Sequence, residues 1–284
     1  RNITSIVTAT TAGTQSKKTS TPRKKRRIVV ALLIDAISLG YIKEAMPDLV
    51  KFMEAPPYGY KKRLLPTFRV VGYNSAPNKA AIFMNNQNTA WPIYKGHLTP
   101  IWTEYEKQGF RTFHSDSTCV AKDADDYRTY RDGCVSRYTL QFFGRGPAMH
   151  NIHPRALCGK SNSCEWRNAS FVQRETISMR CTDDLPDSAH SYNFMRSAMK
   201  RFPDEDLFFS LNPNDFHSPN HLLTEFPQWT KRFLTELMAQ SAEILVFSDH
   251  GFHFSNYYAS AHGYKHHKMP FWYLLSPPSS LYHI

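Results

Sequence analysis

Runs of consecutive apolar residues, rich in β-branched and aromatic side chains, recur along the chain and predict buried strands. The first run, Ile28 to Ile34, holds seven apolar residues in succession. This is far short of the roughly 18–20 residues that a membrane helix needs. Further strands are predicted at residues 69–73, 110–114, 207–211, 243–248 and 271–275.

Between these strands, apolar residues spaced three and four positions apart predict helices. Residues 44–53 show this spacing, and Pro56 with Pro57 ends the segment. Ser75 stands at the N-cap, and Pro77 in the first turn, of a helix that runs to about Met84. Other helices are predicted at 101–108, 191–201 and 221–240. The alternation predicts one α/β domain over residues 28–284, with a mainly parallel sheet sandwiched by helices.

Residues 116–188 interrupt this alternation, because they show no clear period. They hold all five cysteines: Cys119, Cys134, Cys158, Cys164 and Cys181. None of these forms a Cys-x-x-Cys pair, so their spacing does not indicate a zinc finger. We expect a disulfide-stapled insertion with two bridges and one odd thiol; the alternative is a set of buried free thiols. Asn168 and Asn2 begin glycosylation motifs, which favours a secretory-pathway glycoprotein.

The formal net charge of +11 is concentrated at the N-terminus. Residues 1–27 carry eight bases and no acids, whereas the remaining chain holds 27 bases and 24 acids. The first 27 residues are also rich in Ser and Thr, so we expect a disordered basic tail rather than a nucleic-acid-binding face. Its basic run is read as a solvated linker; a nuclear signal or polyanion patch is the alternative. Neither a signal peptide nor a membrane span is visible, which leaves room for an anchor upstream.

Polar residues suited to metal binding or nucleophilic attack follow several predicted strands. In an open parallel sheet the carboxyl ends of the strands meet at one edge, so these side chains are expected to lie together. Carboxylates and imidazoles gathered in this way suit zinc or a similar divalent ion. A serine at a helix N-terminus suits attack on a phosphoryl or sulfuryl ester, because the backbone N–H groups there favour anions. The candidates are Asp35, Ser75, Asp215, His217, Asp249, His250 and His262, with His266 and His267 beside the last.

Three of these candidates lie in short motifs: Leu-Ile-Asp-Ala-Ile-Ser at 33–38, Ser-Ala-Pro-Asn at 75–78 and Ser-Asp-His-Gly at 248–251. Shorter landmarks are Met-Pro at 46–47, Ile-Trp at 101–102, Gly-Phe-Arg-Thr at 109–112, Leu-Cys-Gly at 157–159 and Met-Pro at 269–270. Their order resembles an uncharacterised sulfatase-like animal family, a domain of unknown function in the alkaline phosphatase superfamily. The resemblance spans about residues 28–278 and implies an alkaline-phosphatase-like core.

The resemblance also implies roles for individual residues. Ser75 matches the nucleophile, and Asn78 matches the residue that helps to hold the substrate oxyanion. Asp35 matches a metal-bridging carboxylate. The other implied metal ligands are Asp249 and His250 for one ion, and Asp215 or His217 with His262 for a second.

The implied function is a metal-dependent hydrolase of phosphate mono- or diesters, with two ions, most simply zinc, and an anionic ester as substrate. Ser75 and Lys79 stand where a eukaryotic sulfatase has Cys and Arg, so sulfatase activity is not expected. The alternative is a catalytically inactive member that keeps the cleft as an extracellular binding module, because residues 215–220 depart from the ligand pattern of the family. Either protein, the hydrolase or the inactive binding module, would act in the secretory pathway or outside the cell.

Overall fold

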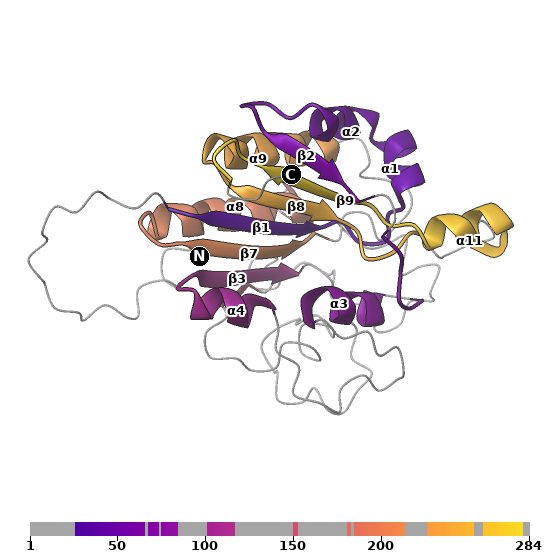
Figure 1. Cartoon of the computed structure of the whole chain (residues 1–284), viewed down its shortest axis with the longest axis horizontal. Coiled ribbons are helices and arrows are strands. Elements are labelled where there is room, and N and C mark those ends of the chain that lie inside the picture. Colours follow the sequence, from indigo (N-terminus) through magenta and orange to yellow (C-terminus); the bar gives the residue numbers. More distant parts are fainter. Residues whose placement is uncertain are drawn as a thin grey trace, which may run out of the picture.

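The computed structural model of the protein describes residues 26–65, 68–73, 75–84, 101–116, 150–152, 181–182, 185–213, 226–252 and 258–280. Within these ranges, seven strands form one mixed sheet in the order β2-β9-β8-β1-β7-β3-β4 (Figure 1). The strands are β1 (Ile28–Leu33), β2 (Lys61–Leu64), β3 (Arg111–Asp116), β4 (His150–Ile152), β7 (Leu207–Asn212), β8 (Glu243–Phe247) and β9 (Trp272–Ser276). A separate antiparallel pair joins β5 (Cys181–Thr182) to β6 (Leu185–Pro186).

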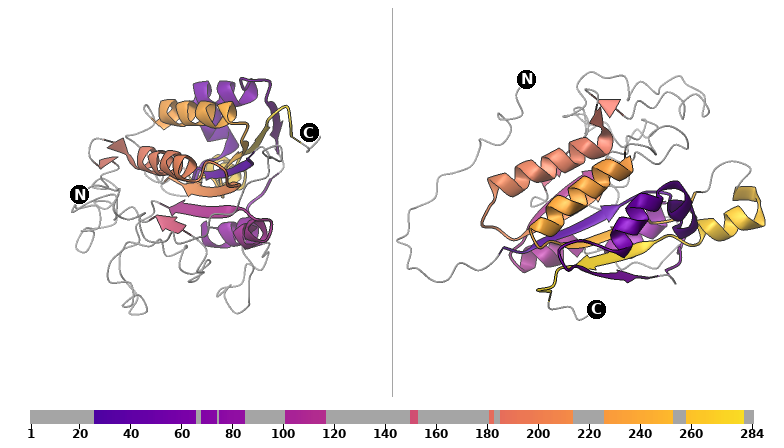
Figure 2. Two further views of the ribbon diagram at one scale, coloured as in Figure 1. Left: turned by 90° about the vertical axis from the view of Figure 1, so that its left-hand side faces the viewer. Right: turned by 90° about the horizontal axis from the view of Figure 1, so that it is seen from above.

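Helices cover both faces of this sheet (Figure 2). The described helices are α1 (Leu39–Ala45), α2 (Pro47–Glu54), α3 (Ser75–Met84), α4 (Ile101–Lys107), α8 (Asp187–Arg201), α9 (Phe226–Ala239) and α11 (Ala261–His267). Helices α1, α2, α8 and α9 contribute to one hydrophobic core, and α3 and α4 to the other. None of the helices in the described ranges is long and apolar enough to cross a membrane.

Strand β1 is the centre of the sheet and runs parallel to both of its neighbours, β7 and β8. Its continuous apolar sequence reflects burial on both faces. Val30 and Leu32 belong to the core under α8 and α9, whereas Ala31 and Leu33 belong to the core over α3 and α4. A strand between two helical layers has no solvated face, so polar residues have no place in it. The predicted mainly parallel α/β fold is therefore confirmed.

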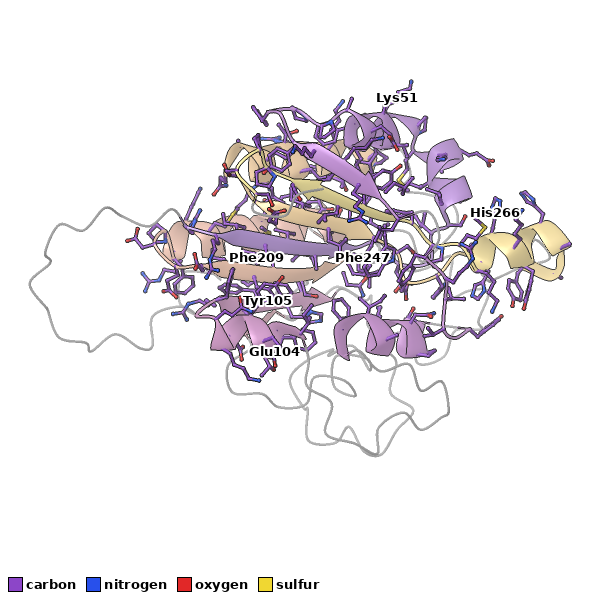
Figure 3. All side chains as sticks on the ribbon, in the orientation of Figure 1. Lys51, Glu104, Tyr105, Phe209, Phe247 and His266 are labelled. Atoms are coloured by element: carbon purple, nitrogen blue, oxygen red, sulfur yellow. The ribbon has the colours of Figure 1, made fainter. Side chains whose placement is uncertain are left out.

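Aromatic stacking holds the helices to the sheet and to one another. On one face, the Tyr192 ring of α8 stacks on Phe233 of α9 at a centroid distance of 4.1 Å. On the other, Tyr105 of α4 stacks on Phe208 of β7 at 4.3 Å. Phe247 of this second core lies at the carboxyl end of β8 (Figure 3), two residues before Asp249.

Three elements differ from the sequence prediction. Residues 69–73 form no strand; the edge strand is β2, whose residues Lys61, Lys62 and Arg63 are exposed and gave no apolar signal. The single helix predicted at 44–53 is two helices, because Pro47 begins α2 at its first position. Helix α11 is absent from the predicted helices, and its N-terminus is capped by Ser260, whose hydroxyl accepts from the Gly263 N–H at 3.0 Å.

Much of the predicted insertion at 116–188 lies outside the described residues. Cys119, Cys134, Cys158, Cys164 and Asn168 are among the residues not described, as is Asn2. Cys181 begins β5. The disulfides and the glycosylation sites therefore stay predictions.

Two arginines at the end of the basic segment belong to the folded domain. Arg26 donates to the carbonyl oxygens of Met199 at 3.0 Å and Phe202 at 3.2 Å. Arg27 forms an ion pair with Asp206, and its backbone carbonyl accepts from the Leu207 N–H at 2.9 Å. These contacts join the start of β1 to the turn before β7, so we expect residues 26 and 27 to stabilise the predicted domain that starts at residue 28.

Truncation will test this boundary. We expect removal of residues 1–25 to leave Tm unchanged within about 1–2 °C, whereas removal of residues 1–27 lowers Tm by about 2–5 °C because the arginine contacts are lost. Differential scanning calorimetry measures both values. The full chain with Arg26→Ala and Arg27→Ala is the matched control and should behave like the longer truncation. Equal Tm values for the two truncations would contradict the boundary.

Candidate active site

The register between β1 and β8 brings two aspartates together. Leu33 of β1 lies opposite Phe247 of β8, and Asp35 and Asp249 each follow that pair by two residues. The Ile34 N–H donates to the Phe247 carbonyl at 2.7 Å, which extends the pairing past the end of β1. Both carboxylates are buried, with 2% of Asp35 and 0% of Asp249 exposed.

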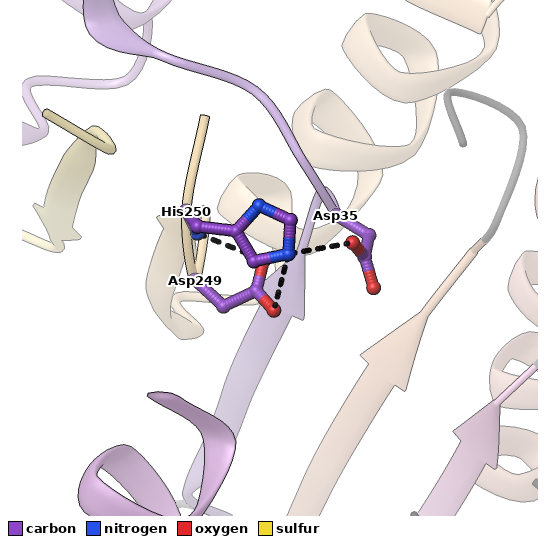
Figure 4. Close-up of side chains that lie close together, drawn as sticks. All are labelled: Asp35, Asp249 and His250. Carbon is purple, nitrogen blue, oxygen red and sulfur yellow. Dashed lines mark hydrogen bonds and ion pairs between the residues drawn. The ribbon is translucent and has the colours of Figure 1, made fainter. Parts of the chain in front are cut away.

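The imidazole of His250 completes this group (Figure 4). Its Nε2 lies 3.8 Å from Oδ1 of Asp35 and 3.7 Å from Oδ2 of Asp249. Its Nδ1 lies 2.8 Å from the carbonyl oxygen of Gly251. A carbonyl only accepts, so Nδ1 carries a proton, and Nε2 faces the two carboxylates, where its lone pair would be directed at a metal ion. Three electron-pair donors thus converge at one buried point.

Ser248 fixes the turn that carries Asp249 and His250. Its hydroxyl donates to the His250 carbonyl at 2.8 Å and accepts from the Ile37 N–H at 3.0 Å. Its own carbonyl accepts from Nε1 of Trp272 at 3.1 Å. The turn after β8 is therefore bound both to the turn after β1 and to β9, which holds the ligand-bearing segments in one arrangement.

Ser75 is the first residue of α3 and is only 6% exposed. Its Oγ lies 3.1 Å from Nε2 of His250 and 3.3 Å from each carboxylate oxygen of Asp35. The hydroxyl has one proton, which it can donate either to an oxygen of Asp35 or to an unprotonated Nε2 of His250. Ser75 thus meets Asp35, which lies 40 positions away in the chain, and His250, which lies 175 positions away, as the sequence predicts.

The donor set fits a divalent metal ion. Oδ1 of Asp249 accepts from the His250 N–H at 3.0 Å and the Ala36 N–H at 3.4 Å, but Oδ2 is buried without a hydrogen-bond partner among the described residues. An unpaired buried carboxylate oxygen is costly, and a bound cation removes that cost. Four ligands at 2.0–2.2 Å from a tetrahedral zinc lie roughly 3.4 Å apart. The separations of 3.7 and 3.8 Å around His250 are close to that value.

Asn78 lies beside Ser75 but binds backbone in this structure. Its Oδ1 accepts from the N–H groups of Val71 at 2.8 Å and Gly72 at 3.1 Å, and its Nδ2 donates to the Gly72 carbonyl at 3.1 Å. Gly72 in turn has no room for a side chain, because a Cβ there would lie 2.2 Å from Cγ of Pro77. Asn78 therefore folds the segment before the serine onto α3. Its role in holding a substrate oxyanion stays a prediction.

His267 of α11 connects the site to the same segment. Its Nε2 lies 2.7 Å from the carbonyl oxygen of Tyr73, and its ring centroid lies 5.5 Å from that of His250. Burial lowers the pKa of His267 to about 4, although the bond to Tyr73 acts in the opposite direction. The ring is therefore neutral at physiological pH, and it donates from Nε2 to the carbonyl. The sequence placed this histidine near the site without assigning it a role.

The structure does not bring the other histidine candidate into the group. His262 is exposed on α11, and its ring lies 4.1 Å from that of His266 one helical turn away (Figure 3 labels His266). The reason is that residues 261–267 form a helix. This helix turns His262 outward, whereas His267 is buried. Asp215 and His217 lie outside the described residues, so a second metal position stays untested.

A residue not predicted as part of the site lies inside it. Lys79, one helical turn after Ser75, places its Nζ 3.2 Å from Oδ2 of Asp35. The two side chains are only 4% and 3% exposed. The signal was present in the spacing, because residues four apart share one face of a helix. A lysine in a first or second turn is, however, most often solvated, and nothing in the composition marked this one as buried.

Comparison with protein families places the chain. The family model described as "Protein of unknown function (DUF229)" matches residues 2–281. The chain belongs to this family. A comparison with curated proteins finds no match.

Several solved structures are similar to this DUF229 chain in fold. The lipoteichoic acid synthase LtaP from Listeria monocytogenes has a TM-score of 0.55 at 10% identity, with 92% of this chain and 67% of that chain covered. A protein in the alkaline phosphatase superfamily from Vibrio parahaemolyticus has a TM-score of 0.54 at 15% identity, with 90% and 61% covered. The periplasmic domain of EcEptC from Escherichia coli in complex with Zn has a TM-score of 0.51 at 9% identity, with 90% and 74% covered. The alkaline-phosphatase-like α/β fold is thereby confirmed, and this chain spans only about three fifths to three quarters of each neighbour.

The close approach at Gly251 gives a test of the site's framework. A Cβ there would lie 2.5 Å from the carbonyl oxygen of His266 and 2.9 Å from Cα of His267, and both are backbone atoms. We expect Gly251→Ala to lower the free energy of unfolding by about 1–3 kcal/mol, because α11 must move away. Urea denaturation measures this. Gly109→Ala, where no atom lies within 4 Å of the added Cβ, is the comparison for backbone strain alone. A smaller loss for Gly251→Ala than for Gly109→Ala would contradict the contact.

Proposed function

We propose that the protein is a metal-dependent hydrolase of phosphate mono- or diesters in which Ser75 is the nucleophile. The observation that carries this proposal is the position of the Ser75 Oγ, 3.1 Å from Nε2 of His250 and 3.3 Å from the carboxylate of Asp35, at a helix N-terminus. A hydroxyl held among a carboxylate, an imidazole lone pair and helix N–H groups suits attack on a phosphorus atom. The chain is similar in fold to an EcEptC domain in complex with Zn, which is consistent with a metal ion bound to a domain of this fold.

The residues of this chain would divide the reaction as follows. The Ser75 Oγ attacks phosphorus and passes its proton to Asp35, while the bond from phosphorus to the leaving oxygen breaks and that oxygen takes a proton from water. The hydroxide formed from that water then attacks the phosphoserine, the Oγ–phosphorus bond breaks, and Ser75 regains its proton from Asp35 as the phosphate product leaves. The N–H groups at the start of α3 face the anionic phosphoryl oxygens. Burial keeps bulk water from competing with these contacts.

A divalent ion held by Asp35, Asp249 and His250 would stabilise the serine alkoxide and offset the charge on the phosphoryl oxygens. We propose zinc as the ion, since two carboxylates and one imidazole form a common donor set for it. The donor set also admits manganese, so the hydrolysis assays below include both metals.

The setting of the enzyme is part of the proposal. We propose that the domain acts in the secretory pathway or outside the cell on an anionic ester, attached to a membrane through a segment outside this chain. The cysteines at 119–181 and the motif at Asn168 support an oxidising compartment. The similar EcEptC domain is described as periplasmic, which is consistent with a domain exposed outside the cytoplasm. No nucleic-acid partner is proposed.

One observation favours the alternative of an inactive binding module. Lys79 forms an ion pair with Asp35, a proposed metal ligand, and His262 does not reach the site. A cleft that has replaced metal by lysine could still bind an anionic group without cleaving it. The two variants below decide between the alternatives.

Removal of the nucleophile should abolish turnover but not metal binding. We expect Ser75→Ala to lower the rate of hydrolysis of p-nitrophenyl phosphate or bis(p-nitrophenyl) phosphate by about a hundredfold or more. Ser197→Ala, at an exposed hydroxyl of α8, is the control and should retain the parent rate. Assays use zinc, manganese and magnesium in turn. Equal rates for Ser75→Ala and the parent would exclude Ser75 as nucleophile, and a parent inactive with every metal and both esters would favour the binding module.

Removal of one carboxylate should abolish metal stabilisation. With zinc at a hundred times Kd, a bound ion stabilises the parent by about 2.7 kcal/mol, seen as a rise in Tm. We expect Asp249→Asn to lose this rise while keeping the hydrogen bonds of Oδ1 to Ala36 and His250. Without metal the variant should be at least as stable as the parent, because one of two buried like charges is gone. Asp48→Asn, exposed on α2, is the control. A full metal-induced rise in Asp249→Asn would rule out the proposed donor set.

A further inference from the structure

The two carboxylate oxygens of Asp35 face different partners. Oδ1 lies 3.8 Å from Nε2 of His250, on the side of the proposed metal ion. Oδ2 lies 3.2 Å from Nζ of Lys79. The Ser75 hydroxyl is equidistant from both oxygens at 3.3 Å. The Asp35 carboxylate therefore contacts the Lys79 ammonium and the Ser75 hydroxyl, and it also faces the position of the proposed metal ion.

Lys79 is held at this position by the fold. It lies four residues after Ser75 on α3, which places both side chains on one face of the helix. The residue is 3% exposed, so the ammonium is removed from bulk water. A buried ammonium is expensive unless a carboxylate compensates it, and here that carboxylate is a proposed metal ligand.

We propose that Lys79 supplies the second positive charge of the site, so that each chain binds one divalent ion rather than two. This inference rests on the proposed metal-dependent function. It replaces the expectation of a second ion that the sequence analysis gave. Asp35 bridges a metal ion and an ammonium instead of two metal ions. Lys79 is a positioning residue, because it acts on the nucleophile through the carboxylate of Asp35.

Charge and space both support a single ion. An ion bound to Oδ2 would lie about 2.0–2.2 Å from that oxygen, and therefore within a few ångströms of the ammonium that already contacts it. The repulsion between a divalent ion and an ammonium at that separation is strong in a buried site. A single ion with Lys79 instead gives the two carboxylates one excess positive charge, which favours an anionic ester. Among the described residues, the metal-ligand group contains only Asp35, Asp249 and His250.

The fixed ammonium also affects how tightly the ion binds. Asp35 shares its negative charge between Lys79 and the metal, so the lysine weakens the metal affinity of the parent protein. Replacement of Lys79 by an uncharged side chain of similar length should therefore strengthen metal binding. A lysine with a merely structural role would have the opposite effect, because its loss would loosen the ligands.

The test compares Lys79→Met, Lys79→Arg and the parent by equilibrium dialysis against zinc, with metal counted by mass spectrometry, and by calorimetric titration. We expect one ion per chain in the parent and in Lys79→Arg, and a fall in the Kd for zinc of about tenfold or more in Lys79→Met. Lys200→Met, exposed on α8, is the control and should match the parent. Two ions per parent chain, or an unchanged or higher Kd in Lys79→Met, would overturn the inference while leaving the proposed hydrolase intact. A parent that binds no ion would overturn both.

Hydrolysis provides a second readout. Lys79→Met should turn over aryl phosphate at least about tenfold more slowly at saturating zinc despite its tighter metal binding, and Lys79→Arg should recover part of that rate. Opposite changes in metal affinity and rate separate a positioning role from a structural one. Parallel changes in the two would contradict the inference.

Folding of the variant is controlled by a double substitution. Lys79→Met leaves Asp35 buried beside Asp249 without the ammonium, whereas Asp35→Asn with Lys79→Met removes both charges of the pair. We expect the double variant to have the circular dichroism spectrum of the parent and weak zinc binding. If Lys79→Met is unfolded without metal, added zinc should restore its spectrum. Failure of zinc to restore it, with the double variant folded, would overturn the inference.

Discussion

The parallel register between β1 and β8 is the constraint on which the site depends. Asp35 and Asp249 lie side by side because both strands end at the same edge and because Leu33 pairs with Phe247. A slip of one residue would send one of the two carboxylates to the opposite face of the sheet. That slip is opposed by burial on both faces of β1, since it would also exchange the residues of the two hydrophobic cores. Packing of the core thus specifies the geometry of the chemistry.

The electrostatics of the site follow from this burial. Two carboxylates lie close together with the imidazole of His250 beside both, and the buried ammonium of Lys79 pairs with Asp35. In the second carboxylate, that of Asp249, Oδ1 accepts from two N–H groups. Its Oδ2 has no hydrogen-bond partner within the described part of the chain. Ala36, which supplies one of those N–H groups, adopts the left-handed conformation at φ 59°. A non-glycine residue in that region stores strain, which the surrounding hydrogen bonds hold in place.

The sequence predicted the central strands and the meeting of Ser75, Asp35, Asp249 and His250, because apolar runs and strand-end positions are local signals. It did not predict β2, whose polar residues pair at an edge without burying apolar surface, or α11, whose start depends on the cap at Ser260. The outward direction of His262 follows from that helix. The ion pair of Lys79 with Asp35 depends on how α3 docks on the sheet, and no local pattern encodes this. Four of the five cysteines and the residues at 215–217 lie outside the described ranges.

The polar edge strand has a consequence for how copies of the molecule meet. Among the described strands, β2 is the last of the sheet on one side, and β9 is its one neighbour. The exposed residues of β2 are Lys61, Lys62 and Arg63. Within the described part of the chain, Lys62 forms an ion pair with Glu54. Two sheets that joined edge to edge through β2 would bring these cations into register. The free rim of the sheet therefore resists strand addition and fibre-like association, which a chain so rich in buried apolar strands would otherwise invite.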